Sequence, residues 1–172
     1  MRISILGYSG SGKSTLAAKI GSKYGIPVLH LDTLHFLPNW VERDNSAMAA
    51  DVAPVVAQPD WVIDGNYSKA VGGDRHDRSD TIIILLFPRL LCLYRAIARY
   101  YKYKGTVRAS VAAGCPEKLD AEFIRWILYK GRTAARRSYY RSIKESYPER
   151  TYIIKSPHQL SRFTLKNFSI KI

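Results

Sequence analysis

The chain has 172 residues and a net charge of +13, and 47% of its residues are hydrophobic. This length fits one domain with a sizeable core, and the apolar content excludes a mainly disordered chain. The charge indicates a surface that attracts anions, but it does not distinguish nucleotides from nucleic acids or membrane surfaces.

The longest apolar run, Thr81 to Phe87, is strand-sized and falls short of the roughly 18–20 residues of a membrane span. No basic region followed by an apolar stretch and a cleavage site begins the chain, so no signal peptide is evident. Cys92, one of two cysteines with Cys115, lies in an apolar helical pattern. We therefore expect no disulfide scaffold, no Cys/His metal cluster, no membrane partner and a reducing, cytoplasmic location.

Short apolar runs alternate with helical patterns along the chain. Strands are expected at 2–6, 27–31, 60–64, 81–87 and 151–155, and helices near 13–24, 44–57, 67–72, 88–103, 117–145 and 157–167. Alternation of this kind predicts an α/β fold in which helices cover both faces of a parallel sheet. We expect a single domain over residues 1–172, with a basic, helical, lid-like subregion at about 103–145.

Residues 7–14, Gly-Tyr-Ser-Gly-Ser-Gly-Lys-Ser, match the phosphate-binding P-loop pattern G-x-x-x-x-G-K-[ST] in full. The match is informative because the motif joins an expected strand to an expected helix. Glycines let the backbone approach phosphates closely, and N–H groups at the helix N-terminus bind their oxygens. Lys13 is expected to reach the β- and γ-phosphates, and the Ser14 hydroxyl to bind Mg²⁺. The expected nucleotide-binding residues are Gly7, Ser9, Gly10, Ser11, Gly12, Lys13, Ser14 and Thr15.

Asp64 ends the third expected strand and is followed by Gly65. In a P-loop fold, the strand beside the first one delivers an acid toward Mg²⁺, usually through water. The alternative is a simple strand-end turn, since Asp-Gly is a strong turn signal. P-loop proteins that hydrolyse ATP often place Glu after this acid, whereas Gly65 is expected to leave room for a second substrate.

Asp32 follows the second expected strand, at the edge where open α/β sheets bind ligands. Its carboxylate could orient or deprotonate an acceptor hydroxyl, or it could cap the next helix, and the sequence favours neither. His30 and His35 are interpreted as packing or loop residues, because nothing nearby suggests a ligand set.

Two groups of arginines are candidates for stabilising a transferring phosphoryl group, the usual task of arginines on mobile segments. The helix near 88–103 is expected to bury a stripe of Leu90, Leu93, Ile97 and Tyr101, which leaves Arg95 and Arg99 on another face. In the second group, Arg132 and Arg136 are expected to share a helix face, with Arg137 nearby. Arg95, Arg132 and Arg136 are therefore candidate catalytic residues, together with Lys13, Asp32 and Asp64.

Arg75 and Arg78 precede the fourth expected strand. One of them could clamp an acceptor anion, or both could pair with neighbouring aspartates at the surface. Most of the remaining basic residues are expected to form a solvated face.

Together these segments resemble the adenylate-kinase-like P-loop kinases and, more closely, the bacterial DNA topology modulation (FlaR-like) family. The resemblance covers nearly the whole chain, and two of its segments, Asp64–Tyr67 and Gly114–Lys118, are more specific than the P-loop. The other matching positions are Gly7–Thr15, His30–Asp32, Trp61–Ile63, Asp80–Thr81, Pro88–Arg89, Cys92–Leu93, Glu122–Phe123, Trp126 and Tyr152–Ser156.

The resemblance implies a five-stranded parallel sheet in the order 2-3-1-4-5, a helical lid and an acceptor-binding region. It places Arg95 against the base and phosphates of ATP, Arg132–Arg137 among the lid arginines, and Lys155–Pro157 beside the adenine. The chain departs from the family at Arg108-Ala109-Ser110, where Arg-x-Asp is expected.

The first hypothesis is a small phosphotransferase that binds MgATP at residues 7–15 and passes the γ-phosphoryl group to a nucleoside, a nucleotide or another small acceptor. A nucleotide acceptor needs an arginine clamp and no base, whereas a hydroxyl acceptor would use Asp32 as base or orienter. The alternative is an ATP-dependent, nucleic-acid-associated regulator of DNA topology, which the charge and the basic, tyrosine-rich segment Tyr100–Lys104 support. A GTPase switch is disfavoured, because no Asn-Lys-x-Asp segment occurs.

Overall fold

The central feature of the computed structural model, which describes residues 1–165, 170 and 171, is a five-stranded parallel sheet. Its strands are β1 (Arg2–Gly7), β2 (Val28–His30), β5 (Trp61–Asp64), β6 (Thr81–Leu85) and β7 (Thr151–Ile154). Neighbouring strands run parallel in the order β2-β5-β1-β6-β7. The α/β fold is thus confirmed, with all five expected strand segments in this sheet. The expected order 2-3-1-4-5 counted only the five strands of this sheet. The strand numbers differ here because two short strands, β3 (Phe36–Leu37) and β4 (Val41–Glu42), precede β5.

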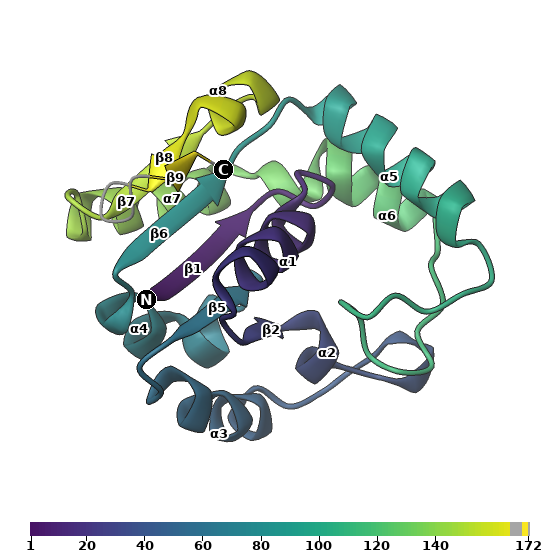
Figure 1. The fold of residues 1–172 in the computed structure, drawn as a ribbon. Helices are drawn as coiled ribbons and strands as arrows, with labels where there is room; N and C mark the ends of the chain where they lie inside the picture. Colours follow the sequence, from purple (N-terminus) through teal and green to yellow (C-terminus); the bar gives the residue numbers. More distant parts are fainter. Residues whose placement is uncertain (166–169, 172) are drawn as a thin grey trace.

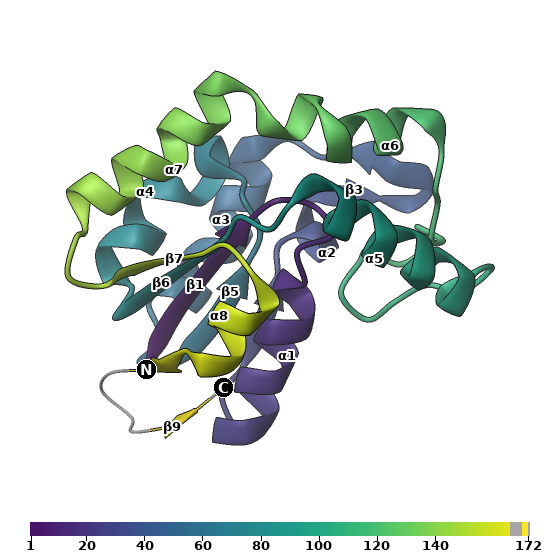
Figure 2. The same cartoon turned by 90° about the horizontal axis from the view of Figure 1, so that it is seen from above.

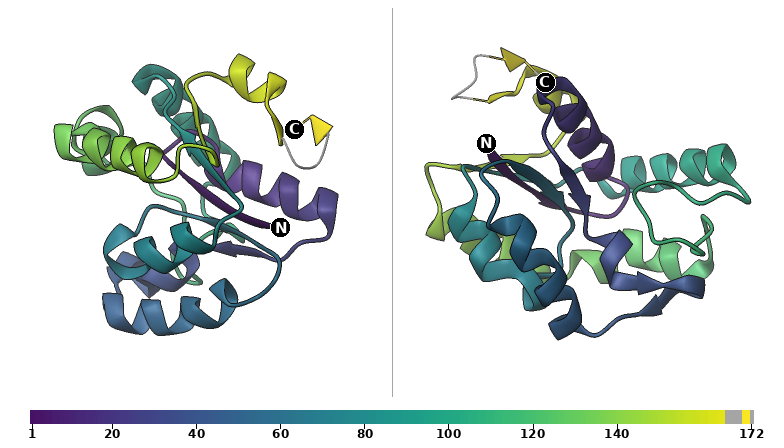
Figure 3. Two further views of the ribbon diagram at one scale, coloured as in Figure 1. Left: turned by 90° about the vertical axis from the view of Figure 1, so that its left-hand side faces the viewer. Right: turned by 60° about the horizontal axis from the view of Figure 1, so that its bottom comes forward.

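Helices cover both faces of the sheet (Figures 1 and 2). One face carries α1 (Lys13–Tyr24) and α8 (Pro157–Arg162), and the other carries α3 (Asn45–Val56), α4 (Ser68–Arg78) and α7 (Ala134–Ser146). Figure 3 shows the two helical layers from other sides. The remaining helices, α2 (Asp32–His35), α5 (Arg89–Tyr103) and α6 (Ala121–Leu128), lie toward the edge where the strands end. None of the helices in the described part of the chain is long and apolar enough to cross a bilayer.

The strands are buried because apolar side chains project from both of their faces. In β5, Val62 joins the core beneath α1, while Trp61 and Ile63 join a second cluster with Met48 and Val52 of α3. The short antiparallel strand β8 (Thr164–Leu165) pairs with β9 (Ile170–Lys171) after α8.

Three sequence expectations about helices are wrong. The stretch 117–145 is two helices, α6 and α7, separated by a 3-10 turn at Lys130–Arg132. The helix expected at 157–167 ends at Arg162, and residues 166 and 167 lie outside the described residues. In α5, Leu90 and Tyr101 are 71% and 73% exposed, whereas Cys92 and Ala96 are buried. The expected stripe is therefore wrong at Leu90 and Tyr101, whereas Leu93 and Ile97 are half-buried and Leu93 packs against the main core. The buried face is shifted because α5 also packs on the P-loop and α6.

Arg75 is a buried cation in α4, directly behind the segment that follows β5. Its side chain donates to the carbonyl oxygens of Gly65 (3.0 Å) and Asn66 (3.5 Å). Burial lowers the pKa of Arg75 to about 10, so the guanidinium remains charged at neutral pH. Both sequence interpretations of Arg75 are wrong, because a residue with 0% exposure neither clamps a ligand nor pairs at the surface. It holds the backbone after β5 in place instead.

Replacing Arg75 by Met should therefore destabilise the fold. The buried carbonyls of Gly65 and Asn66 would lose their donor, which costs about 1–3 kcal/mol of unfolding free energy. Arg78→Met is the matched control, since Arg78 is an exposed arginine of the same helix and its replacement should change stability by no more than about 0.5 kcal/mol. Urea denaturation measures both variants, and equal midpoints for the two would contradict this role.

Candidate active site

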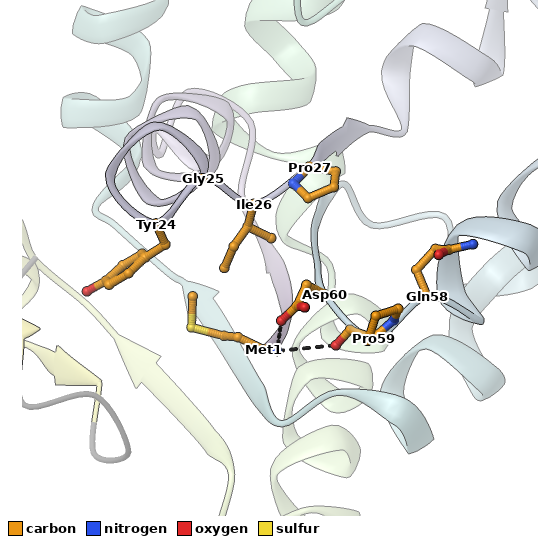
Figure 4. A pocket seen from close by; sticks show the side chains of 8 residues that line it. All are labelled: Met1, Tyr24, Gly25, Ile26, Pro27, Gln58, Pro59 and Asp60. Atoms are coloured by element: carbon orange, nitrogen blue, oxygen red, sulfur yellow. Dashed lines mark hydrogen bonds and ion pairs between the residues drawn. The ribbon is translucent and has the colours of Figure 1, made fainter.

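A cleft of about 1940 Å³ opens at the carboxyl edge of the sheet. It is lined by the P-loop, the ends of β2 and β5, the β3–β4 hairpin, the cleft-facing side of α5, the loop after α5, and parts of α6, α7 and α8. A smaller hollow of about 490 Å³ lies at the other end of β1, where the Met1 amino group bonds Asp60 and the Pro59 carbonyl (Figure 4). None of the candidate catalytic residues lines this second hollow, so we place the chemistry in the larger cleft.

The P-loop adopts a backbone that a side chain would disrupt. Gly10 has a φ of +77°, and a Cβ there would lie 2.4 Å from the carbonyl oxygen of Cys92. A Cβ on Gly7, whose φ is +135°, would lie 2.2 Å from the Leu85 carbonyl oxygen. Gly12 precedes α1 in the left-handed region and supplies no side-chain cap. The first N–H groups of α1 are therefore left for a ligand, and phosphate oxygens suit such a helix terminus.

Asn66 fixes the P-loop to the sheet. Its side-chain amide donates to the Gly7 carbonyl oxygen at 3.0 Å, and its Oδ1 accepts from the Gly7 N–H at 3.0 Å. The Tyr140 hydroxyl donates to the same Oδ1 at 3.3 Å. The sequence analysis named Asn66 only as part of the family resemblance. The one feature that could have predicted this contact is its position directly after β5, the strand that pairs with β1.

Asp64 lies at the centre of the candidate site and is only 4% exposed. The Ser14 hydroxyl donates to its Oδ2 at 2.8 Å, and His30 Nδ1 bonds its Oδ1. The strand register sets His30 of β2 directly beside Asp64 of β5. The interpretation of His30 as a packing or loop residue is therefore wrong, because its ring positions the Asp64 carboxylate.

Ser14 and Asp64 fit a magnesium ion. Both offer hard oxygens, and they lie next to the phosphate-binding amides. Mg²⁺ takes one or two protein oxygens and completes its shell with water and substrate phosphates, so a large cluster is not needed. In keeping with this, the part of the chain that the structure describes holds no group of three His, Cys, Asp or Glu side chains able to bind a metal.

Lys13 reaches back over the P-loop, and its ammonium donates to the Tyr8 carbonyl oxygen at 3.2 Å. Burial lowers the pKa of Lys13, while the negative charges of Asp32 and Asp64 oppose the shift. Lys13, Asp32 and Asp64 all line the cleft.

Asp32 is the first residue of α2, and the cap position belongs to Leu31. Its carboxylate accepts a hydrogen bond from the Tyr67 hydroxyl at 2.6 Å. Burial and the Asp32 charge raise the pKa of Tyr67, so the phenol stays a donor. Gly65 lines the cleft, and a Cβ there would lie 2.8 Å from the Leu31 Cβ, so packing against Leu31 requires a glycine at this position. That Gly65 leaves room for a second substrate stays a prediction.

Arg95 and Arg136 both line the cleft. Arg95 donates to the Ser11 carbonyl oxygen at 3.0 Å and lies 5.2 Å from the Phe87 ring centre. Arg136 stacks on Trp126 at 4.6 Å, and the Trp126 indole donates to the Ser9 hydroxyl at 3.2 Å. These contacts bring α6 and the start of α7 onto the P-loop.

Arg132 takes a different position from its expected partner Arg136. It donates to the carbonyl oxygens of Ile127 (2.8 Å) and Phe87 (3.0 Å), and its guanidinium lies 3.8 Å from the Tyr8 ring centre. The expected shared helix face is wrong, because Thr133 caps α7 between the two arginines. Arg132 is absent from the cleft lining and supports the P-loop from behind.

Glu117 pairs with two arginines that line the cleft, and the sequence analysis named it only within the matching segment Gly114–Lys118. It is 8% exposed, and it accepts hydrogen bonds from Arg99 of α5 (2.8 Å) and from Arg108. The ion pairs tie the loop between α5 and α6 to α5 itself. Asn39 and Trp40 of the hairpin region in turn bond the Gly114 and Pro116 carbonyls of that loop.

No protein-family model and no curated protein matches the chain. Among solved structures, an uncharacterized protein from Eubacterium ventriosum is similar, with a TM-score of 0.50 and 14% identity over 90% of this chain and 89% of that one. A gluconokinase from Sinorhizobium meliloti has a TM-score of 0.49 and 16% identity over 91% and 82% of the two chains. A shikimate kinase from Aquifex aeolicus has a TM-score of 0.44 and 18% identity over 59% and 77%. Identities this low concern the fold alone, so function must be argued from the site.

Gly10→Ala tests the phosphate-binding loop against a matched glycine. Gly25 also has a positive φ, of +66°, but a Cβ there would meet nothing within 4 Å. Both variants should lose about 1–2 kcal/mol of stability from the left-handed backbone. Only Gly10→Ala, which must displace the loop from the Cys92 carbonyl, should also lose most of the rise in melting temperature that MgATP causes. A full rise in that variant would contradict the assignment.

Proposed function

We propose that the protein is a phosphotransferase that moves the γ-phosphoryl group of ATP to the hydroxyl of a small acceptor. The observation that carries this proposal is the convergence, in one cleft, of a glycine-built phosphate cradle, the Ser14–Asp64 pair and a second carboxylate, Asp32. A nucleotide-binding site alone would not need Asp32 on the far side of the cleft.

The P-loop amides and Lys13 bind the triphosphate in this proposal. Ser14, and Asp64 through water, would hold Mg²⁺, which would supply positive charge to neutralise the phosphates. His30 keeps the Asp64 carboxylate aimed at that position. The adenine lies at the end of the cleft that Pro157 and Leu160 line.

Asp32 orients the acceptor hydroxyl and takes its proton. A bond forms between the acceptor oxygen and the γ-phosphorus while the bond from phosphorus to the β–γ bridging oxygen breaks, and ADP leaves. The proton on Asp32 then passes to water. Tyr67 donates to one carboxylate oxygen and leaves the other for the acceptor.

Arg95 and Arg136 supply positive charge from the cleft wall, and Arg132 is assigned to supporting Tyr8 instead of phosphate. The loop between α5 and α6, together with α6, acts as the lid. Its closure excludes water, so that the acceptor and not solvent receives the phosphoryl group.

Asp32→Asn separates acceptor activation from nucleotide binding. The amide keeps an oxygen for Tyr67 but cannot take a proton, so acceptor-dependent ADP release should fall by about 100-fold or more while MgATP still binds. Asp74→Asn, an exposed carboxylate of α4, should leave the rate unchanged. A coupled assay of ADP release over nucleosides, nucleotides and sugars measures both, with Lys13→Ala as the inactive reference.

The same assay decides between the phosphotransferase and its rival. If no small acceptor stimulates ADP release, and DNA does so with a structural preference, the regulator of DNA topology replaces the kinase. Salt-dependent binding to random DNA alone does not count, because a charge of +13 would produce it.

A further inference from the structure

The arginines on the acceptor side of the cleft are already occupied by the protein's own carboxylates and carbonyls. Arg99 presents Nε and Nη2 to one oxygen of Glu117 at 2.8 and 2.7 Å, and Arg108 presents Nε to the other oxygen. The Glu117 carboxylate thus fills the position that the phosphate or carboxylate of an anionic substrate would take between two guanidinium groups.

Two further arginines and one lysine near this end also have partners within the protein, whereas Lys69 and Lys102 of the cleft lining are exposed. Arg75 is buried on two carbonyls, and Arg43 pairs with Asp51 at 2.6 Å. Lys118 pairs with Asp120 at 3.3 Å and lies 5.5 Å from the Trp40 ring centre. Lys69 lines the cleft as an exposed, solvated ammonium. Arg99, Arg108, Arg43 and Arg75 thus each bond a carboxylate or carbonyl of the protein itself.

Aromatic rings form a continuous wall on the same side of the cleft. The ring centres are 4.3 Å apart for Tyr67 and His35, 4.7 Å for His35 and Phe36, and 5.2 Å for Phe36 and Trp40. All four side chains line the cleft. A wall of this kind suits a flat ring. Such a ring gains contact area against the wall and gives up few hydrogen bonds to water.

The chain holds Trp40 in this wall against its backbone preference. Asn39 and Trp40 both have a φ of +64°, in the left-handed region that residues with a Cβ rarely adopt. The Asn39 N–H donates to the Gly114 carbonyl oxygen at 3.0 Å, and the Trp40 indole donates to the Pro116 carbonyl oxygen at 3.2 Å. The unfavourable backbone conformation of Trp40 is held by these contacts next to the cleft. Such strain is typical of functional sites, and we infer that the Trp40 ring has a function.

Two of the polar side chains beside the wall, Asp32 and Glu42, are carboxylates. Asp32 and Glu42 line the cleft there, together with the amide of Asn45. Carboxylates accept hydrogen bonds from hydroxyl, amino and imino groups, and they repel phosphate and carboxylate. The side therefore favours an uncharged, hydrogen-bonding ring compound.

We propose, given the phosphotransferase function above, that the acceptor is an uncharged nucleoside. Its base lies along the wall of Tyr67, His35, Phe36 and Trp40, and a ribose hydroxyl meets Asp32. Glu42 and Asn45 bond the edge of the base. A nucleoside monophosphate or a sugar acid fits less well, because its anion meets Asp32 and Glu42 and finds Arg99 and Arg108 already taken by Glu117.

Binding of acceptors without ATP tests this inference separately from catalysis. Calorimetry is run with adenosine, guanosine, cytidine and uridine, with their 5′-monophosphates, and with gluconate and shikimate as acid acceptors. At least one nucleoside should bind about 10-fold tighter than its own monophosphate. Its affinity should change by less than about twofold between roughly 50 and 500 mM salt, because no ion pair forms.

Trp40→Ala supplies the matched variant test. It should weaken nucleoside binding by about 10-fold or more while MgATP binding is retained, since the ring contacts Phe36, Lys118 and the Pro116 carbonyl, which lie outside the P-loop. Leu37→Ala, an exposed apolar residue of the same hairpin that does not line the cleft, should leave nucleoside affinity unchanged. Equal effects of the two variants would overturn the proposed wall.

The outcomes distinguish this inference from the proposed function. If MgATP binds but monophosphates or sugar acids bind more tightly than nucleosides, the nucleoside inference fails and the phosphotransferase stands. If MgATP binds and no nucleoside does, the inference fails in the same way. If MgATP does not bind the folded protein at all, the proposed function itself is lost.

Discussion

The paired hydrogen bonds between the Asn66 side chain and the Gly7 backbone, both 3.0 Å long, set the position of the phosphate-binding loop. The glycines of the loop carry no side chain that could fix them, and a Cβ at Gly7 or Gly10 would collide with neighbouring backbone. The loop is therefore held from outside, by the segment that follows β5. Arg75 and Tyr140 support that segment in turn, through the Asn66 carbonyl and the Asn66 side chain.

The four residues Asp64–Tyr67 each make a different contact, and together they join the two halves of the cleft. Asp64 accepts from Ser14, Gly65 allows Leu31 to pack, Asn66 holds Gly7, and Tyr67 donates to Asp32. In the proposed phosphotransferase, this one short stretch of backbone would align the nucleotide and acceptor sides. The basic character of the chain serves this arrangement as well, because Arg75, Arg99 and Arg132 bond carbonyls or Glu117 and are not simply surface charges.

Local patterns were sufficient for the strands, the P-loop and the parallel sheet, since these depend on periodicity and on a motif with defined flanks. Local patterns could not predict contacts between segments that are distant in the sequence. His30 needed the register of β2 against β5, and Arg75 needed knowledge of what α4 packs upon. Arg132 was misplaced because one helix was expected through Gly131 and Thr133, the residues at which the chain turns and then caps α7. The buried face of α5 was misassigned because its partner is the P-loop backbone at Cys92. Glu117 gave no local signal that it would neutralise two arginines from different elements.

The central claim is that the segment after β5 holds a cradle for a triphosphate. Calorimetric titration of ATP in magnesium buffer into the wild-type protein and into Asn66→Ala tests it most directly. The account predicts binding at one site in the wild type and an affinity at least about 10-fold lower in Asn66→Ala, where Gly7 loses both side-chain partners. A folded wild-type protein that gives no binding heat across a range of temperatures, or an Asn66→Ala variant with unchanged affinity, would contradict it.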